Sequence, residues 1–275
     1  MQNLKSGQQH RAQQYQHGKK QKAHKYKNTI SFLQQGLENN AAAMNDGPRV
    51  KHWTKHDLRN IKPLTVAQQD LFESFFNGDQ ICAYGSAGTG KSYSIIWLSL
   101  SELFREDSKQ NRIIIVRSCV PTRDVGFLPG TLEEKEAPYE SPYIDIFSDI
   151  CGKYTTYEDM KKAGIVEFTT TANIRGVSWN DAIVVIDEAQ NMTIGELNTL
   201  MGRIGKNTRV MVLGDVCQND LVKRKGDESG FPVFLKIIDT MPEFNKVQFT
   251  RDDIVRSNFC KSWICALEDY FAKVV

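Results

Sequence analysis

From about residue 60 onward, short apolar runs alternate with stretches in which apolar residues recur at helical spacing. The runs are continuous and rich in β-branched residues, which predicts strands buried on both faces, as in a parallel sheet. They lie at 80–84, 112–117, 166–169, 182–187, 209–215 and 246–250. The helical stretches lie at 92–106, 193–204 and 257–272. Strands that alternate with helices predict a three-layer α/β domain with a mostly parallel sheet.

The first 48 residues follow neither pattern, because they are rich in Gln, Lys and His and poor in apolar residues. Such a segment cannot bury enough apolar surface to offset the entropy of ordering it. We therefore predict a disordered or loosely helical extension over 1–48 and a folded domain over 49–275. Residues 1–37 contain no Asp or Glu but carry several lysines and an arginine. The extension is either a basic arm that contacts nucleic-acid phosphates or a solvated tail without a partner.

The overall composition is ordinary for a globular protein, with 40% hydrophobic residues, 25% charged residues and a formal net charge of +2. No apolar run approaches the roughly 18 residues that cross a membrane, and the N-terminus lacks the apolar region of a signal peptide. The six cysteines form no CxxC pair or other zinc-binding spacing. We therefore expect a cytoplasmic protein with reduced thiols and no membrane contact.

The segment GSAGTGKS (85–92) lies between the first predicted strand and the helix that follows it. It matches G-x-x-x-x-G-K-[ST], in which glycines let backbone N–H groups surround a phosphate. Lys91 is expected to reach the β- and γ-phosphates of ATP, and the Ser92 hydroxyl to ligate Mg²⁺. Gln68 either reads the adenine edge through its amide or lies on the exposed face of a helix. The predicted nucleotide-binding residues are Gln68, Gly85, Ser86, Ala87, Gly88, Thr89, Gly90, Lys91, Ser92 and Tyr93.

Two acidic residues follow the apolar run AIVVI, at the end of the strand 182–187. Ligands of open α/β sheets bind at the carboxyl ends of the strands. Asp187 is therefore expected to hold Mg²⁺, and Glu188 to orient and deprotonate the attacking water. The alternative for this pair is a helix N-cap. Gln218 follows the strand 209–215 and is expected to sense the γ-phosphate or bind the water.

These motifs resemble those of the PhoH-like ATPase family, which is related to the first helicase superfamily. The resemblance covers about residues 60–260, and its most specific part is VRSCVPTRDVGFLPGTLEEKEAPYESPYID (116–145). Ser118 departs from the family's proline, and Val177 replaces an arginine in NIRGVSW (173–179). The resemblance implies a RecA-like P-loop NTPase core with ATP and Mg²⁺ as cofactors. It also implies single-stranded nucleic acid as a partner, with RNA favoured over DNA.

The same resemblance raises the question of which arginine reaches the γ-phosphate. Helicase motors clamp ATP between two cores, and we expect no second core in the residues that follow the loop. We therefore predict a homo-oligomeric ring, most simply a hexamer, in which a neighbouring subunit supplies the arginine. The candidates are Arg251 and Arg256, with Arg203 third, and their alternative is a role as surface charge.

Arginines on loops after the strand ends are the candidate nucleic-acid contacts. Arg117, Arg123 and Arg175 are predicted to bind backbone phosphates, and Phe127 and Tyr139 to stack on bases. Two functions remain open at this point. One is an ATP-driven motor on single-stranded RNA or DNA, favoured by the predicted hydrolytic residues. The other is a nucleotide-dependent switch that binds partners without translocating, favoured by the modest net charge of +2.

Overall fold

The computed structural model describes residues 53–118, 131–174, 176, 178–215 and 228–274. The predicted extension over 1–48 therefore lies outside the described residues. The described strands are β1 (Gln80–Gly85), β2 (Arg112–Arg117), β3 (Val166–Thr170), β4 (Ala182–Asp187), β5 (Arg209–Gly214) and β6 (Phe244–Phe249). Each coincides with a predicted run to within a few residues.

The strands form one sheet in the order β3-β2-β4-β5-β1-β6. Every neighbouring pair in it is parallel. Alternate residues of a strand face opposite cores: Ile113 and Ile115 of β2 belong to one apolar cluster, and Ile114 and Val116 to the other. Burial on both faces explains why the runs are continuously apolar.

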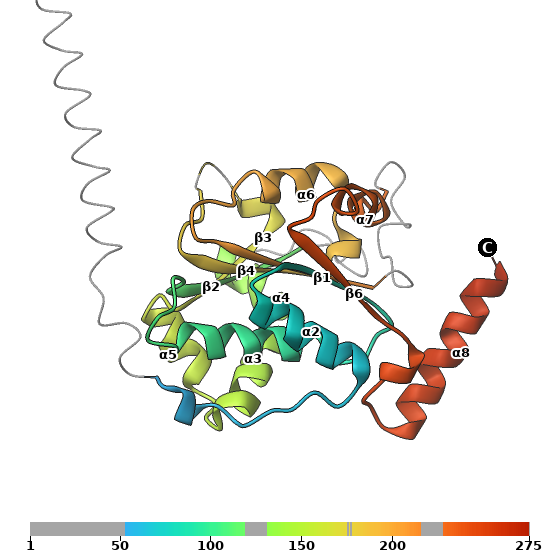
Figure 1. The fold of residues 1–275 in the computed structure, drawn as a ribbon, viewed down its shortest axis with the longest axis horizontal. Helices are drawn as coiled ribbons and strands as arrows, with labels where there is room; N and C mark the ends of the chain where they lie inside the picture. The colour runs from blue at the N-terminus through green and yellow to red at the C-terminus, as the bar shows by residue number, and fades with distance from the viewer. Residues whose placement is uncertain (1–52, 119–130, 175, 177, 216–227, 275) are drawn as a thin grey trace, which may run out of the picture. The chain divides into compact units, whose positions relative to one another are not determined.

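Helices cover both faces of the sheet (Figure 1). One face carries α2 (Val66–Asn77), α3 (Lys91–Leu103), α4 (Leu132–Cys151) and α5 (Thr156–Lys162). The other face carries α6 (Ile194–Met201) and α7 (Phe231–Ile238). The last helix is α8 (Asn258–Val274), and short 3-10 turns lie at Lys55–Asp57, Thr171–Asn173, Ala189–Asn191 and Arg251–Asp253. The predicted three-layer α/β fold with a mostly parallel sheet is confirmed.

The helix α4 was not predicted, because its sequence carries two prolines and no clear apolar stripe. It begins with a capping box, in which the Thr131 hydroxyl accepts from the Glu134 N–H at 3.3 Å and the Glu134 carboxylate accepts from the Thr131 N–H at 2.8 Å. Tyr143, Phe147 and Ile150 then lie on one face of the helix and are buried against the sheet. No helix within the described residues is both long and apolar enough to cross a membrane.

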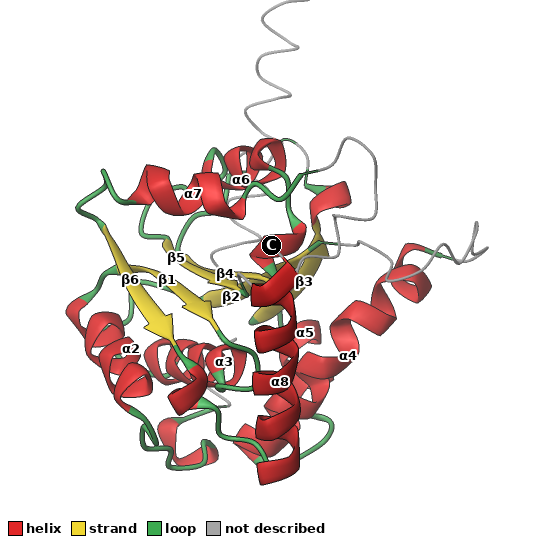
Figure 2. Ribbon diagram, turned by 90° about the vertical axis from the view of Figure 1, so that its right-hand side faces the viewer, coloured by secondary structure: helices red, strands yellow, loops and turns green. Residues whose placement is uncertain are grey.

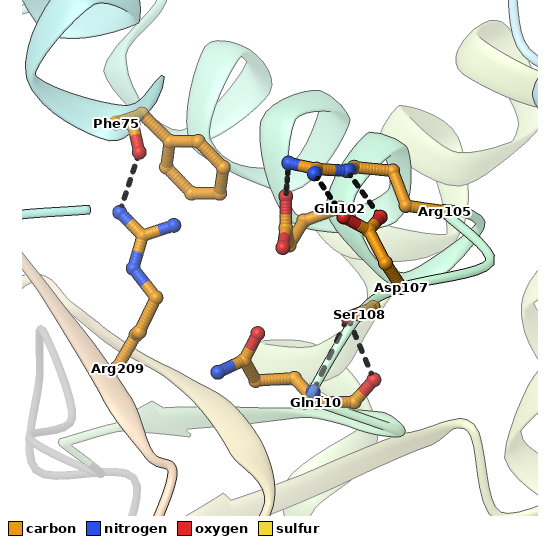
Figure 3. Close-up of polar contacts among 7 residues, drawn as sticks. All are labelled: Phe75, Glu102, Arg105, Asp107, Ser108, Gln110 and Arg209. Atoms are coloured by element: carbon orange, nitrogen blue, oxygen red, sulfur yellow. Dashed lines mark hydrogen bonds and ion pairs between the residues drawn. The ribbon is translucent and has the colours of Figure 1, made fainter. Parts of the chain in front are cut away.

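A half-buried arginine joins the sheet to α2 at the end opposite the predicted nucleotide loop. Arg209, the first residue of β5, donates to the Phe75 carbonyl at 2.8 Å, and its guanidinium lies 4.1 Å from the centre of the Phe75 ring. Burial lowers the pKa of this guanidinium. Figure 3 shows it beside a surface cluster in which Arg105 binds Glu102 and Asp107. The two arginines therefore lie in contrasting environments, Arg209 half-buried and Arg105 exposed.

This contrast gives a prediction about stability. Arg209→Ala should lower the free energy of unfolding by about 2–3 kcal/mol, because it removes charge-assisted hydrogen bonds to part-buried backbone carbonyls. A second of these bonds goes to the Asp79 carbonyl at 3.1 Å. Urea denaturation monitored by circular dichroism measures the loss. Arg105→Ala is the matched control and should cause no measurable loss, so equal losses in the two variants would show that Arg209 is not a structural anchor.

Candidate nucleotide site

The predicted loop joins the end of β1 to the start of α3 and contacts the end of β6. Gly85 has φ 122°, and a Cβ atom at this position would lie 1.9 Å from the Phe249 carbonyl oxygen. The Ser86 N–H donates to that same oxygen at 3.1 Å. Only glycine allows this close approach, which sets the direction in which the loop leaves the sheet.

Lys91, the first residue of α3, has its side chain folded back onto the backbone of the loop. Its Nζ donates to the carbonyl oxygens of Gly85 at 3.0 Å and Ser86 at 2.7 Å, and lies 3.4 Å from the Thr89 hydroxyl. Burial lowers the pKa of this ammonium, and the surrounding carboxylates, Asp215 foremost, oppose that shift. The loop therefore holds a desolvated positive charge where a phosphate would bind.

Gln68 connects α2 to the loop. Its Nε2 donates to the Thr89 carbonyl at 2.9 Å, and its Oε1 accepts from the Leu64 N–H at 2.8 Å. The residue is only 5% exposed, so the alternative of an exposed helix face is wrong. A contact with adenine stays a prediction, and the bond to Thr89 gives the amide a second role in fixing the loop.

The two carboxylates lie at the end of β4, and one strand, β5, separates β4 from β1. Asp187 is buried, and its Oδ2 accepts from the Tyr143 hydroxyl at 2.7 Å. Its Oδ1 accepts from the Glu188 N–H at 2.9 Å. Because all strands are parallel, the ends of β1 and β4 meet at the same edge of the sheet. The fold thus brings the carboxylates to the edge that carries Lys91.

Glu188 is held in an unusual backbone conformation, with φ 55° in the left-handed region. It precedes the 3-10 turn Ala189–Asn191 but makes no side-chain cap bond, so its side chain does not act as an N-cap. Burial raises the pKa of this carboxyl, the neighbouring Asp187 raises it further, and Arg117 partly opposes the shift. A carboxylate with a raised pKa is a stronger proton acceptor, which suits a general base.

Gln190 is a site residue that the sequence reasoning missed. It is buried, its Nε2 donates to the Glu188 carboxylate, and its Oε1 accepts from the Asp215 N–H at 2.9 Å. One amide thereby links the ends of β4 and β5. The sequence offered only a weak indication, a glutamine two residues after Glu188, and burial was needed to single it out.

Comparison with known proteins gives the family. The family model described as "PhoH-like protein" matches residues 60–268, which is most of the chain. The chain belongs to the PhoH-like family. It is 32% identical over 199 residues to the PhoH-like protein of Bacillus subtilis, covering 72% of this chain and 61% of that protein. It is likewise 32% identical over 210 residues to Protein PhoH of Escherichia coli K12, covering 74% and 58%.

This PhoH-like chain thus spans less than two thirds of the length of these curated relatives. Solved structures are more distant. The Pif1 helicase from Candida albicans covers 70% of this chain and 41% of its own at 17% identity, with a TM-score of 0.36. The HK97 bacteriophage large terminase covers 74% of this chain and 44% of its own at 11% identity, with a TM-score of 0.41.

The PhoH-like site also contains Arg117, which was predicted to bind nucleic acid. Its guanidinium donates to the Tyr139 carbonyl at 3.2 Å and lies 3.8 Å from the Glu188 carboxylate. Tyr139, a base-stacking candidate, packs partly buried against the core. The Arg117 side chain therefore points towards Glu188, the predicted general base. Four further predicted site residues lie outside the described residues: Arg123, Phe127, Arg175 and Gln218.

Two of the three arginine candidates for the γ-phosphate, Arg251 and Arg256, make contacts within their own chain. Arg251 pairs with Glu268 and Asp269 of α8, at 2.5 Å in each case. Arg256 lies against the loop, since a Cβ atom on Gly88 would be 3.0 Å from the Arg256 Cγ. Their action in trans stays a prediction, as does that of the third candidate, Arg203.

Tyr93, the last of the predicted nucleotide-binding residues, uses its hydroxyl to join α3 to α4. It donates to the Asp149 carboxylate at 2.6 Å, and Arg59 pairs with the same carboxylate at 2.8 Å. Burial and the bond to Asp149 raise the pKa of Tyr93 to about 12. The hydroxyl is therefore a structural donor here, and nucleotide contact by Tyr93 stays a prediction.

The donor groups fit the metal that the family implies. Ser92 is the second residue of α3, next to Lys91, and Asp187 supplies a buried carboxylate from β4. Both are hard oxygen donors, which Mg²⁺ prefers. No three His, Cys, Asp or Glu side chains among the described residues could hold a metal by themselves. Mg²⁺ is commonly held by a few protein oxygens together with substrate phosphates, so Ser92 and Asp187 stay the predicted ligands.

Proposed function

We propose that this PhoH-like protein binds ATP with Mg²⁺, hydrolyses it, and couples hydrolysis to the binding or unwinding of single-stranded nucleic acid, with RNA preferred. The observation that carries the hydrolytic part is the meeting of Lys91 with Asp187 and Glu188 at one edge of the sheet. A phosphate-binding cation and a paired carboxylate are the parts that this reaction requires.

Each group has a distinct part in the proposed reaction. Lys91 exchanges its loop carbonyls for the phosphate oxygens, because charged oxygens are stronger acceptors than carbonyls. Glu188, oriented by Gln190 and Arg117, accepts the proton of the attacking water. Mg²⁺, when bound by Ser92 and Asp187, neutralises charge on the phosphates. Tyr143 keeps the Asp187 carboxylate in place through its hydrogen bond.

The nucleic-acid part of the proposal rests on charge and on family membership. The basic extension over 1–48 and the arginines at 123 and 175 could bind backbone phosphates without reading sequence. Arg117 is used at Glu188, so it would contact nucleic acid only by leaving that carboxylate. Binding through phosphates should weaken steeply as salt is raised.

The second candidate function is the nucleotide-dependent switch, and one observation favours it. The side chains of Arg256 and Ile264 lie against Gly88, so α8 rests directly on the loop. A change in the loop would reach α8 without any translocation along nucleic acid. The switch and the motor share the nucleotide site and differ in whether nucleic acid accelerates turnover.

We also propose that the protein acts in the cytoplasm as a homo-oligomeric ring, most simply a hexamer. Support comes from α8, where Phe259 is 82% exposed and Trp263 and Tyr270 are each 62% exposed. Grouped exposed aromatic side chains are typical of interaction surfaces. In such a ring Arg251 or Arg256 would act on the ATP of a neighbouring subunit.

The test is steady-state ATP hydrolysis by the full chain with Mg²⁺, alone and with single-stranded RNA or DNA of the same sequence and length. We expect turnover that RNA stimulates several-fold and DNA stimulates less. Stimulation should fade between low and high salt. Light scattering on the same samples gives the number of subunits. Turnover that ignores both nucleic acids would favour the switch, and absence of Mg²⁺-dependent phosphate release would overturn the hydrolytic proposal.

A further inference from the structure

The helix α8 and the segment before it lie directly on the phosphate loop. The Val255 N–H donates to the Gly88 carbonyl at 3.1 Å. A Cβ atom on Gly88 would lie 3.2 Å from Ile264 Cδ1, which is tighter than an ordinary contact, so this side chain of α8 lies against the loop. Figure 2 shows α8 lying across the edge of the domain in front of α3. The loop therefore has α8 as an immediate neighbour.

The segment before α8 is itself firmly anchored. Asp253 is buried and accepts from the Thr250 N–H at 2.9 Å and from the Ala67 N–H of α2 at 3.4 Å. Burial alone would raise the pKa of this carboxyl, but the hydrogen bonds it accepts outweigh burial and leave the pKa lowered. The anchored segment fixes where α8 begins, so the position of α8 over the loop is set by the fold.

The face of α8 that meets the loop carries a negative charge. Glu268 is four residues after Ile264, which places both on the same face of the helix. The Glu268 side chain is only 11% exposed, and its carboxylate binds the Arg251 Nε. Together with Asp215, Asp187 and Glu188, which act more strongly, it raises the pKa of the Lys91 ammonium against the effect of burial.

The next residue provides a natural comparison. Asp269 binds the same Arg251 guanidinium through NH1, but its side chain is 58% exposed. Two adjacent carboxylates thus share one arginine, and the buried one faces the loop. The difference between them separates the effect of charge at the loop from the effect of holding Arg251.

We propose that Glu268 sets the affinity and the selectivity of the loop for nucleoside triphosphates, by opposing the incoming phosphates and by holding Arg251 until they bind. This inference rests on the proposed function, since its ligand is ATP. The incoming phosphates bring negative charge to Lys91 and make the nearby Glu268 carboxylate unfavourable there. ATP carries one more negative charge than ADP, so the opposition is greater for ATP. When Glu268 moves away, Arg251 keeps only its exposed partner, Asp269, and is held less firmly.

The test compares Glu268→Gln with Asp269→Asn in the full chain. Each variant removes one of the two carboxylates from Arg251, but only Glu268→Gln removes the charge beside the loop. Isothermal titration calorimetry with Mg²⁺ and a slowly hydrolysed ATP analogue, and then with ADP, gives the dissociation constants. We expect Glu268→Gln to bind the analogue about 3–10-fold more tightly than wild type, with a smaller gain for ADP. Asp269→Asn should stay within about twofold of wild type.

For a third variant we expect the opposite change in affinity for the ATP analogue. Arg251→Gln leaves the Glu268 carboxylate beside the loop without its main partner, so the ATP analogue should bind more weakly than to wild type. If Glu268→Gln fails to fold, the affinity of Arg251→Gln for the analogue still tests the role of Glu268, and unchanged or tighter binding would contradict that role. Unchanged or weaker binding by Glu268→Gln, or an equal gain in Asp269→Asn, would overturn the role of Glu268. Failure of wild type to bind the analogue would instead overturn the proposed function.

Discussion

Replacing Glu188 with glutamine is expected to slow ATP hydrolysis by about 10²–10⁴-fold, the usual contribution of a positioned general base. The substitution preserves size and leaves an oxygen that can accept from Gln190, so the local structure should persist. It removes the proton-accepting carboxylate whose pKa is raised by burial and by Asp187. Binding of ATP should stay within a few-fold of wild type. Single-turnover hydrolysis measures the first quantity and calorimetry the second.

The matched control is Glu167→Gln, since Glu167 lies on β3 with its side chain exposed and 3.7 Å from Arg112. This variant also loses one carboxylate from the same sheet but should hydrolyse ATP at the wild-type rate. A loss of less than tenfold in Glu188→Gln would show that another group accepts the proton. Equal losses in both variants would indicate a general effect of charge.

Replacing Lys91 with alanine is expected to weaken ATP binding by about 10²-fold or more and to remove measurable turnover. The ammonium is buried in the loop, and truncating one partner of a buried charged contact has effects of this size. The fold should persist, because the substitution also removes the free-energy cost of burying an ammonium. The same burial lowers the pKa of Lys91. Nucleotide binding by calorimetry and thermal unfolding of the same sample measure the two expectations.

Lys236→Ala is the control for this variant, because Lys236 is an exposed lysine on α7. It changes the net charge of the protein by the same amount and should bind ATP as wild type does. If Lys91→Ala bound ATP normally, the loop would not be the phosphate site. If it unfolded, the bonds from Lys91 to the Gly85 and Ser86 carbonyls would be structural and the binding test would need Lys91→Arg.

The parts of the structure that local sequence determines were predicted well. The strand Arg112–Arg117 was predicted with its observed bounds, because a run of β-branched residues buried on both faces leaves few alternatives. The helix predicted over 92–106 ends at Leu103, because Phe104 caps it and the chain turns there. The helix α4 was missed because its prolines at 138 and 142 hide a helix that the capping box at Thr131 begins.

The parts that depend on contacts between distant segments could not be predicted. Arg117 was assigned to nucleic acid because it follows a strand, and only the register of β2 beside β4 places it near Glu188. Gln190 carries no motif of its own, and its role depends on the N–H at the end of β5. The position of α8 on Gly88 joins segments that are far apart in the chain. Sequence spacing gave the chemistry of the site but not the neighbours of each group.

The amide of Gln190 has a consequence for what this position can contain. An amide has one end that only donates and one that only accepts, so the link from Glu188 to the Asp215 N–H has a polarity. Glutamate has the same shape but no donor, and it would place an additional carboxylate against Glu188. Leucine would fill the volume and satisfy neither strand end. Few side chains other than an amide can meet both demands, which makes this glutamine as restricted in identity as the groups that handle the phosphate.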